Sequence, residues 1–276
     1  MEKQISDSAN SKIDQSPLMI EITRIIKAKS SLYEHSYFRY ALRSVYACLF
    51  LSLGTAIAFA VAMRSEEIIP NSGKFLFAFM FSWSLVMILF LNGELGTSNM
   101  LYMTIAYHKK ILTFKKAVKI LSTCLVFNLI GGIFFSFLIS NTSPFNQLSM
   151  HNFFFDSIST KLAKSSLQII IEGIFANIVV NIAVLICLKM KDDSAKVITT
   201  VFIIYIFAFL GYEHVIANFP ALFLAYFSSH GQVENFNVIS VVHNLFFALI
   251  GNYIGGGLIM GIGYSWLNSF DSPYLD

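Results

Sequence analysis

Six long apolar segments dominate the pattern of hydrophobic and polar positions along the chain. Each is about 20 residues long or longer, the length that an α-helix needs to cross the hydrocarbon core of a bilayer. We therefore expect an all-α membrane protein with six spans. The pattern predicts these spans over residues 38–63, 74–106, 117–140, 163–189, 196–227 and 239–268.

Two of these spans, the second and the fifth, are interrupted by a short polar string. The strings run from Gly93 to Asn99 and from Gly211 to Asn218, and in both a glutamate stands five residues before an asparagine. A carboxylate at mid-bilayer costs roughly 2.5 to 3.5 kcal/mol, and a break in a membrane helix leaves backbone groups without partners. Interrupted spans at matching positions of two halves indicate a transport site.

The two strings belong to an internal repeat. They are offset by 119 residues, since 213 − 94 and 218 − 99 agree, and the motif at residues 128–132 recurs at residues 252–256. Chance recurrence in a biased composition is an alternative for the second pair, but the shared spacing of the first argues against it. We therefore divide the spanning region into halves over 38–140 and 163–268. Because each half has an odd number of spans, the two form an inverted repeat.

Basic residues fall mainly on one side of these spans. Lysines crowd the connection between the second and third spans, whereas residues 141–160 and 228–238 contain no lysine or arginine. The positive-inside rule then puts both termini in the cytoplasm. The expected organisation is a cytoplasmic segment over 1–37 with an amphipathic helix at Leu18 to His35, a transmembrane domain over 38–268 and a cytoplasmic tail over 269–276.

Composition agrees with this class and argues against others. Of the 276 residues, 56% are hydrophobic and 13% are charged, and the formal net charge is only +3. A polytopic membrane protein in a lipid bilayer is expected, with no nucleic-acid partner. The three cysteines lie in apolar runs without C-x-x-C spacing, so we predict neither a disulfide framework nor a metal site, and no cofactor.

The interruptions place polar groups inside the membrane. After each break the next half-helix presents unpaired N–H groups and the positive end of its dipole, and two such ends together favour an anion. We expect Thr97 or Ser98 to be the N-cap of the first half-helix, with Thr97 as a candidate donor to a ligand. The residues expected to stabilise the breaks are Glu94, Asn99, Glu213 and Asn218.

One histidine and two lysines are further candidates. His214 is the only histidine predicted deep inside a span, and its place in the break favours a role in handling protons over a packing role. Lys161 and Lys164 lie at the start of the fourth span, on the side that is otherwise poor in basic residues. Snorkelling to the interface explains either lysine without a function, whereas a lysine that faces a pore would draw anions in.

Four of the motifs resemble those of the formate and nitrite transporter family. They are the strings at residues 93–98, 173–177, 211–218 and 251–256, and the resemblance extends over about residues 35–268. It implies an aquaporin-like fold of six spans in a bacterial plasma membrane. It also implies a homo-pentamer with one pore per subunit, which conducts small monovalent anions such as formate, nitrite, hydrosulfide or lactate.

By position, the resemblance also assigns roles to single residues. It implies that His214 is the central pore histidine, Lys161 the lysine of the outer vestibule, Thr97 the threonine of the loop and Asn177 a polar residue near the site. The apolar constrictions would be formed by Phe81 and Phe207 on the outer side and by Leu85 and Leu95 on the inner side.

One position departs from the family pattern. The family usually has a phenylalanine where this chain has Gly96. We therefore expect a wider inner slit, which would admit lactate or another monocarboxylate besides formate.

The expected mechanism is proton-linked. An anion cannot cross an apolar slit bare, because a full charge is too costly to desolvate there. Its neutral acid can, with His214 or water supplying the proton.

A membrane-embedded enzyme that uses Glu213 and His214 is a distant alternative, because the chain has no H-E-x-x-H motif and no Walker loop. A neutral-solute pore is another, but the twin Asn-Pro-Ala signature is missing.

Overall fold

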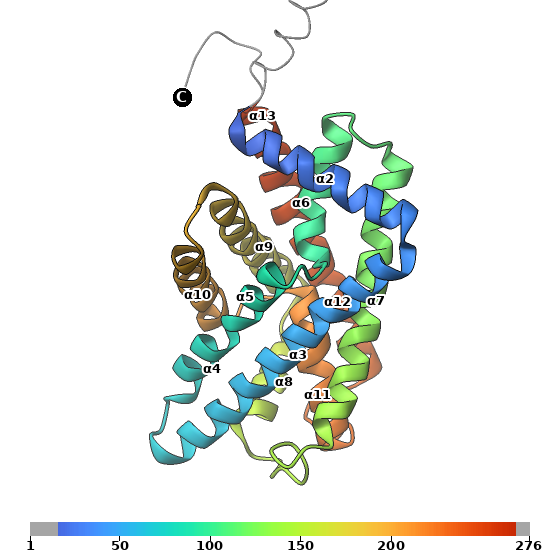
Figure 1. The fold of residues 1–276 in the computed structure, drawn as a ribbon. Helices are drawn as coiled ribbons and strands as arrows, with labels where there is room; N and C mark the ends of the chain where they lie inside the picture. Colours follow the sequence, from blue (N-terminus) through green and yellow to red (C-terminus); the bar gives the residue numbers. More distant parts are fainter. Residues whose placement is uncertain (1–15, 269–276) are drawn as a thin grey trace, which may run out of the picture.

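The described part of the chain, residues 16–268 of a computed structural model, consists of helices joined by short connections (Figure 1). The first residues of the expected amino-terminal segment, 1–15, and the expected tail, 269–276, lie outside it. Within residues 16–268 there is no strand, and six helical segments are long and apolar enough to cross a membrane. The expected all-α membrane fold with six spans is confirmed.

Four spans run without a non-helical break. Their bounds lie close to those expected from the apolar segments, because long runs of hydrophobic residues specify membrane helices directly. The last of them changes from an α-helix to a π-helix part-way. These spans are α3 (Tyr37–Ile68), α7 (Phe114–Ser140), α9 (Ser166–Lys189), and the succession of α12 (Val238–Asn252), η1 (Tyr253–Ile262) and α13 (Gly263–Leu267).

The second and fifth spans are broken, as expected. The second comprises α4 (Gly73–Phe81), α5 (Trp83–Phe90), a break at 91–95 and α6 (Gly96–His108). The fifth comprises α10 (Asp193–Leu210), a break at 211–214 and α11 (Val215–Ser229). Gly211 ends α10 with a φ of 71°, a left-handed conformation that glycine adopts at little cost.

The packing repeats between the two halves. In the first half α3 packs against α7, and in the second α9 packs against α12. Glycines make both contacts close: a side chain at Gly131 would collide with the Val45 carbonyl, and one at Gly251 with the Ile170 carbonyl. Such small residues let membrane helices approach at backbone distance.

Helix α2 (Pro17–His35) precedes the first span and lies across the end of α6 (Figure 1). Ser16 caps it by accepting a hydrogen bond from Met19 N–H at 3.2 Å. Its apolar side is buried against the protein, with Ile22 and Ile26 fully buried. The amphipathic pattern therefore corresponds to a helix docked on the protein.

Helix α8 (Phe153–Leu162) was not predicted. It lies in the connection between α7 and α9, where we placed no span, and it is capped by Asn152, whose side chain accepts from Phe155 N–H at 2.9 Å. Its buried face packs on α3 and α11. Ten residues are too few for a span, so the search for apolar segments of spanning length passed over it.

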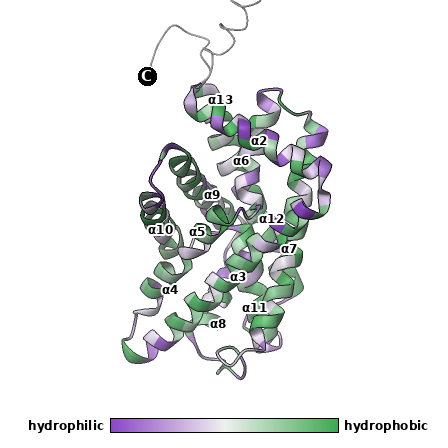
Figure 2. Cartoon of the chain, viewed as in Figure 1, coloured by the Kyte–Doolittle hydropathy of each residue, from purple (hydrophilic) through white to green (hydrophobic). Residues whose placement is uncertain are grey.

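Helices α2 and α8 lie at opposite ends of the molecule. We call these the α2 end, which also holds the lysine-rich connection at 109–113, and the α8 end (Figure 1). Hydrophobic residues predominate along the spans between these ends, and hydrophilic ones concentrate in α2 and in the connections (Figure 2). The two ends therefore correspond to the two aqueous sides of the membrane.

Candidate functional site

The break in the second span is held by a buried asparagine of α7. Asn128 accepts a hydrogen bond from Gly96 N–H at 2.9 Å and donates to the Glu94 carbonyl at 2.9 Å. Its amide also donates to the Ser44 carbonyl on α3 at 2.6 Å. One side chain thus satisfies the backbone groups on both sides of Leu95. The hydrocarbon core of the membrane holds no water that could replace it.

The break in the fifth span is held in the same way from the last span. Asn252 accepts from Val215 N–H at 2.8 Å and donates to the Glu213 carbonyl at 2.8 Å and the Gly173 carbonyl at 2.8 Å. The residue between the two clamped groups is His214. Since 214 − 95 equals the repeat offset of 119, His214 and Leu95 are equivalent positions of the two halves.

Each glutamate ties its break to the half-helix that follows. Glu94 accepts from Asn99 at 3.0 Å, and Glu213 accepts from Asn218 at 2.7 Å. This contact explains the shared five-residue spacing in the sequence. The carboxylates bind side chains, however, and the broken backbone itself is held by the asparagines of α7 and α12.

Lysines from α2 and α8 reach the same two carboxylates. Lys29 of α2 pairs with Glu94, and Lys161 of α8 pairs with Glu213 at 2.9 Å. Glu94 is 4% exposed and Glu213 is fully buried, so both charges need these partners. The tertiary fold therefore repeats a lysine–carboxylate pair at each break, with lysines from the helices that precede α3 and α9.

The second break has an additional lysine. Lys164 donates to Glu213 at 2.8 Å, to Glu172 at 2.6 Å and to the Gly211 carbonyl at 3.0 Å, so all three ammonium protons are engaged. Burial alone would lower the pKa of Lys164, but Glu213 and Glu172 together raise it above its ordinary value. Burial prevails at Lys161 and lowers its pKa, because Glu213 compensates only in part. Lys164 is thus the firmly held cation of the pair.

The amino ends of the two half-helices meet through a hydrogen bond. His214 is the N-cap of α11, where its Nδ1 accepts from Ala217 N–H at 3.1 Å. Its Nε2 lies 2.8 Å from the Thr97 hydroxyl on α6. An Nδ1 that accepts a hydrogen bond carries no proton, so this network assigns the neutral tautomer in which Nε2–H donates to Thr97.

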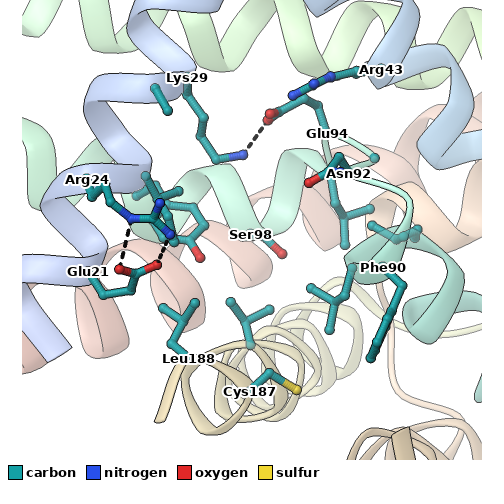
Figure 3. A pocket seen from close by; sticks show the side chains of 18 of the residues that line it. Glu21, Arg24, Lys29, Arg43, Phe90, Asn92, Glu94, Ser98, Cys187 and Leu188 are labelled. Atoms are coloured by element: carbon teal, nitrogen blue, oxygen red, sulfur yellow. Dashed lines mark hydrogen bonds and ion pairs between the residues drawn. The ribbon is translucent and has the colours of Figure 1, made fainter. Parts of the chain in front are cut away.

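Three cavities lie in succession between the two ends. An α8 vestibule of about 760 Å³ contains Lys161 and Lys164 in its lining, and an α2 vestibule of about 540 Å³ contains Lys29 and Glu94. Figure 3 shows Lys29 reaching from α2 toward Glu94 in the second of these. Between them lies a chamber of about 20 Å³, with His214 in its lining.

Apolar side chains separate the chamber from both vestibules. Phe81 and Phe207 line both the chamber and the α8 vestibule, with ring centroids 6.1 Å apart. Leu95 and Ile88 line both the chamber and the α2 vestibule, and Leu85 lines the chamber. Four of these five side chains were expected from the sequence. Ile88 was not, since it is one of many aliphatic residues in α5.

Comparison with known proteins decides the family. A family model described as formate/nitrite transporter matches residues 19–266, which is most of the chain. The chain belongs to the formate/nitrite transporter family. Its members are transporters and channels, so the membrane-embedded enzyme considered above is excluded.

Relatives and solved structures agree with this assignment. A protein named as the uncharacterized transporter YwcJ of Bacillus subtilis is 28% identical over 243 residues, which cover 87% of this chain and 93% of the relative. The formate-nitrite transporter of Plasmodium knowlesi is 32% identical over 211 residues, which cover 72% of this chain and 66% of the relative.

Two solved structures share the fold. One, described as an FNT family ion channel, has a TM-score of 0.84 and 19% identity, and the match covers 91% of this chain and 98% of that one. The other, described as a pentameric formate channel with formate bound, has a TM-score of 0.71 and 22% identity, with 85% and 98% covered. The aquaporin-like fold with two inverted repeats is therefore confirmed for this formate/nitrite transporter.

Two residues assigned to the pathway lie beside it in this transporter. Asn177 is fully buried and does not line any of the three cavities; its amide donates to the Thr97 carbonyl at 3.2 Å and the Asn252 carbonyl at 2.8 Å. Thr97 also does not line the chamber and reaches it through His214. Asn177 thus positions the half-helix, whereas Thr97 orients the histidine.

The expected N-cap of α6 was wrong. The cap position is Leu95, which has no side-chain cap, and Thr97 and Ser98 lie within the helix. A hydroxyl cap is unnecessary because Asn128 satisfies the Gly96 N–H from another helix. Ser98 instead lines the α2 vestibule.

The expectation that Gly96 widens the inner slit also fails on geometry. A Cβ at this position would lie 2.6 Å from Leu125, 3.0 Å from the clamping oxygen of Asn128 and 3.2 Å from Ile216. Gly96 therefore faces the packing between α6, α7 and α11, and it does not line the chamber. Its missing side chain accommodates this packing and leaves the slit between Leu85 and Leu95 unchanged.

We therefore predict that Gly96→Phe destabilises the protein. Forcing a ring into the contact with Leu125 and Asn128 should cost about 3 kcal/mol or more, the upper range for overpacking. Gly96→Ala should be mild, because the end of Leu125 can turn away. Thermal unfolding in detergent measures both; a stable Gly96→Phe protein with narrowed substrate selectivity would contradict this geometry.

Sequence reasoning missed the roles of several residues. Asn128 and Asn252 were noticed only as part of the repeated motif, although a buried asparagine at matching positions of both halves was a usable signal. Lys29 carried none, since only the docking of α2 brings it to Glu94.

Proposed function

We propose that this chain forms a pathway for small monovalent oxygen acids, with formate or a related monocarboxylate as the substrate. The solute crosses the centre as the neutral acid, together with a proton. Nitrite, hydrosulfide and lactate are the alternative substrates within the same family.

The observation that carries the proposal is the narrow chamber between the two vestibules. It measures about 20 Å³ and is lined mainly by apolar side chains, with apolar constrictions on both sides. A bare anion would lose its hydration there without a counter-charge, which is prohibitive in energy. The neutral acid of the same solute loses far less.

The α8 vestibule concentrates the anion before this step. Lys161 lines it and has one hydrogen-bond acceptor among the described residues, Glu213, for its three ammonium protons, so it can bind an arriving carboxylate. The positive ends of α6 and α11 meet at the chamber beyond it and attract the same charge. Water in the vestibule then supplies the proton as the anion is desolvated.

His214 contributes as a neutral hydrogen-bonding group. Protonation of its Nδ1 would break the cap on Ala217 N–H, so the network opposes the imidazolium form. The proton that accompanies the solute therefore comes from the vestibule, and His214 stays neutral in the wall of the chamber.

The chamber favours formate and nitrite over larger acids. At about 20 Å³ it holds roughly one small polar molecule without rearrangement, as a single water needs about 10 to 15 Å³. Gly96 does not enlarge the slit, so the reason for expecting lactate as a substrate no longer applies.

The family and the charge pattern also support an assembly and an orientation. The fold neighbour described as a pentameric formate channel supports a homo-pentamer with a pathway in each subunit. The lysine-rich connection at 109–113 supports a cytoplasmic α2 end, with both termini inside a bacterial plasma membrane.

The test is uptake of labelled formate by the purified protein in liposomes, with the membrane voltage clamped at zero. An acidic exterior should raise the initial rate several-fold over equal pH, because the neutral acid and the inward proton gradient both increase as external pH falls. Uptake that follows voltage and ignores the pH gradient would show a conducting anion channel instead.

His214→Asn provides the matched variant. Asparagine is a good N-cap and a donor, but it does not titrate. Proton-linked uptake should persist in this variant at a reduced rate. Its conversion to voltage-driven uptake would assign the proton to His214.

A further inference from the structure

Ser84 brings a second polar side chain to the wall of the chamber. It lies on α5, three residues after Phe81 and one before Leu85, and it lines the chamber together with His214. It is 1% exposed. A polar side chain between two apolar constrictions is costly in free energy, so its presence there indicates a function.

The Ser84 hydroxyl has no hydrogen-bond partner among the described residues. It points into a notch on α3 at Gly54, where a Cβ would overlap its oxygen. In this notch the Ser84 hydroxyl lies against an apolar wall. One step between staggered χ1 rotamers turns a serine oxygen away from such a wall, and the adjacent open space is the chamber.

His214 differs from Ser84 in that its hydrogen-bonding capacity is already used. Its Nδ1 accepts from Ala217 N–H, and its Nε2 is bonded to Thr97. A neutral acid that enters the chamber brings one O–H donor and one oxygen acceptor, and both need partners in a dry site. Ser84 can donate to or accept from either.

We propose that Ser84 is a substrate-contacting residue that hydrogen-bonds the neutral oxygen acid inside the chamber. The inference rests on the proposed function. The second half has no equivalent group, since the position at the repeat offset of 119 is Ile203. The chamber is therefore polar on the α5 side through Ser84 alone, and the hydroxyl replaces part of the hydration that the acid loses.

Ser84→Ala tests this directly, because it removes only the oxygen. In liposomes under an inward proton gradient, the ratio of maximal formate uptake rate to KM should fall about fivefold, as expected for the loss of one neutral hydrogen bond. The melting temperature should stay the same or rise, since the hydroxyl has no partner in the structure to lose.

Ser52→Ala is the matched control. Ser52 is also 1% exposed, its hydroxyl also has no partner among the described residues, and it does not line any of the three cavities. Formate uptake by this variant should equal that of the parent protein.

The outcomes separate the two proposals. If the parent protein carries formate and Ser84→Ala carries it equally well, the assignment of Ser84 is wrong. A loss of uptake accompanied by a lower melting temperature also overturns it, because the hydroxyl would then support the fold. If the parent protein itself carries no oxygen acid, the proposed function fails, whatever Ser84→Ala does.

Discussion

Glu213→Gln should destabilise the protein by about 3 kcal/mol, with transport lost at the same time. Glu213 is fully buried and accepts hydrogen bonds from two lysines, Lys161 and Lys164, and from two asparagines, Asn218 and Asn244. Glutamine keeps the shape but leaves Lys161 without a counter-charge and Lys164 with Glu172 alone. Removing one partner of a buried ion pair is costly because the other charge stays behind.

The same change at Glu94 should cost about half as much. Glu94 pairs with one lysine, Lys29, and one asparagine, Asn99, so a single charge is left unpaired. Glu67→Gln serves as the surface control, because Glu67 is exposed and pairs with the exposed Arg64. Thermal unfolding in detergent ranks the three variants.

A second substitution sharpens this prediction. Lys161→Met in the Glu213→Gln background removes the ammonium group that Glu213→Gln leaves without a carboxylate. Part of the stability should return. An equal melting temperature for Glu213→Gln and Glu67→Gln would mean that the buried ion network contributes nothing to the folded protein.

Asn252→Ala should abolish transport and lower stability by about 3 kcal/mol. The side chain satisfies Val215 N–H and the Glu213 carbonyl, which flank His214, and its loss leaves both buried groups unpaired at about 1 to 3 kcal/mol each. His214 would then lose the backbone frame that directs its ring toward Thr97. Formate uptake and the melting temperature measure the two effects separately.

Asn128→Ala is the comparison within the repeat. It removes the same two clamping bonds around Leu95, so its cost in stability should be similar. Because Leu95 is a constriction residue, this variant should leak small ions where Asn252→Ala is inactive. Asn141→Ala, at an exposed asparagine, should behave like the parent protein. Full activity of Asn252→Ala would refute the clamp.

Much of the fold was predictable because membrane spans are specified locally. The apolar segments, the two breaks and the repeat offset are all properties of neighbouring or matching residues, and each appears in the structure at about the expected position. The helix α8 is the exception. Its ten residues carry no spanning signal, and its helical state depends on packing against α3 and α11.

The site was predictable in its list of residues but less so in their arrangement. His214, the two phenylalanines and the two leucines line the chamber as expected from the family motifs. Asn177 and Gly96 were assigned to the pathway by position in a motif, and both proved to lie in the packing behind it. A motif identifies which residues occur together, whereas the direction of a side chain depends on the helix that packs against it.

The sequence by itself determined six spans, two interruptions, an inverted repeat and the family. The spans and the interruptions follow from the hydrophobic effect and from the cost of a charge in the membrane, which act on short stretches of chain, whereas the family was indicated by the resemblance of four motifs. Only the tertiary structure decided that Asn128 and Asn252 hold the breaks, that Lys29 and Lys161 pair with the two carboxylates, and that Ser84 lines the chamber. These contacts join residues far apart in the chain, so their partners are set by how the helices pack.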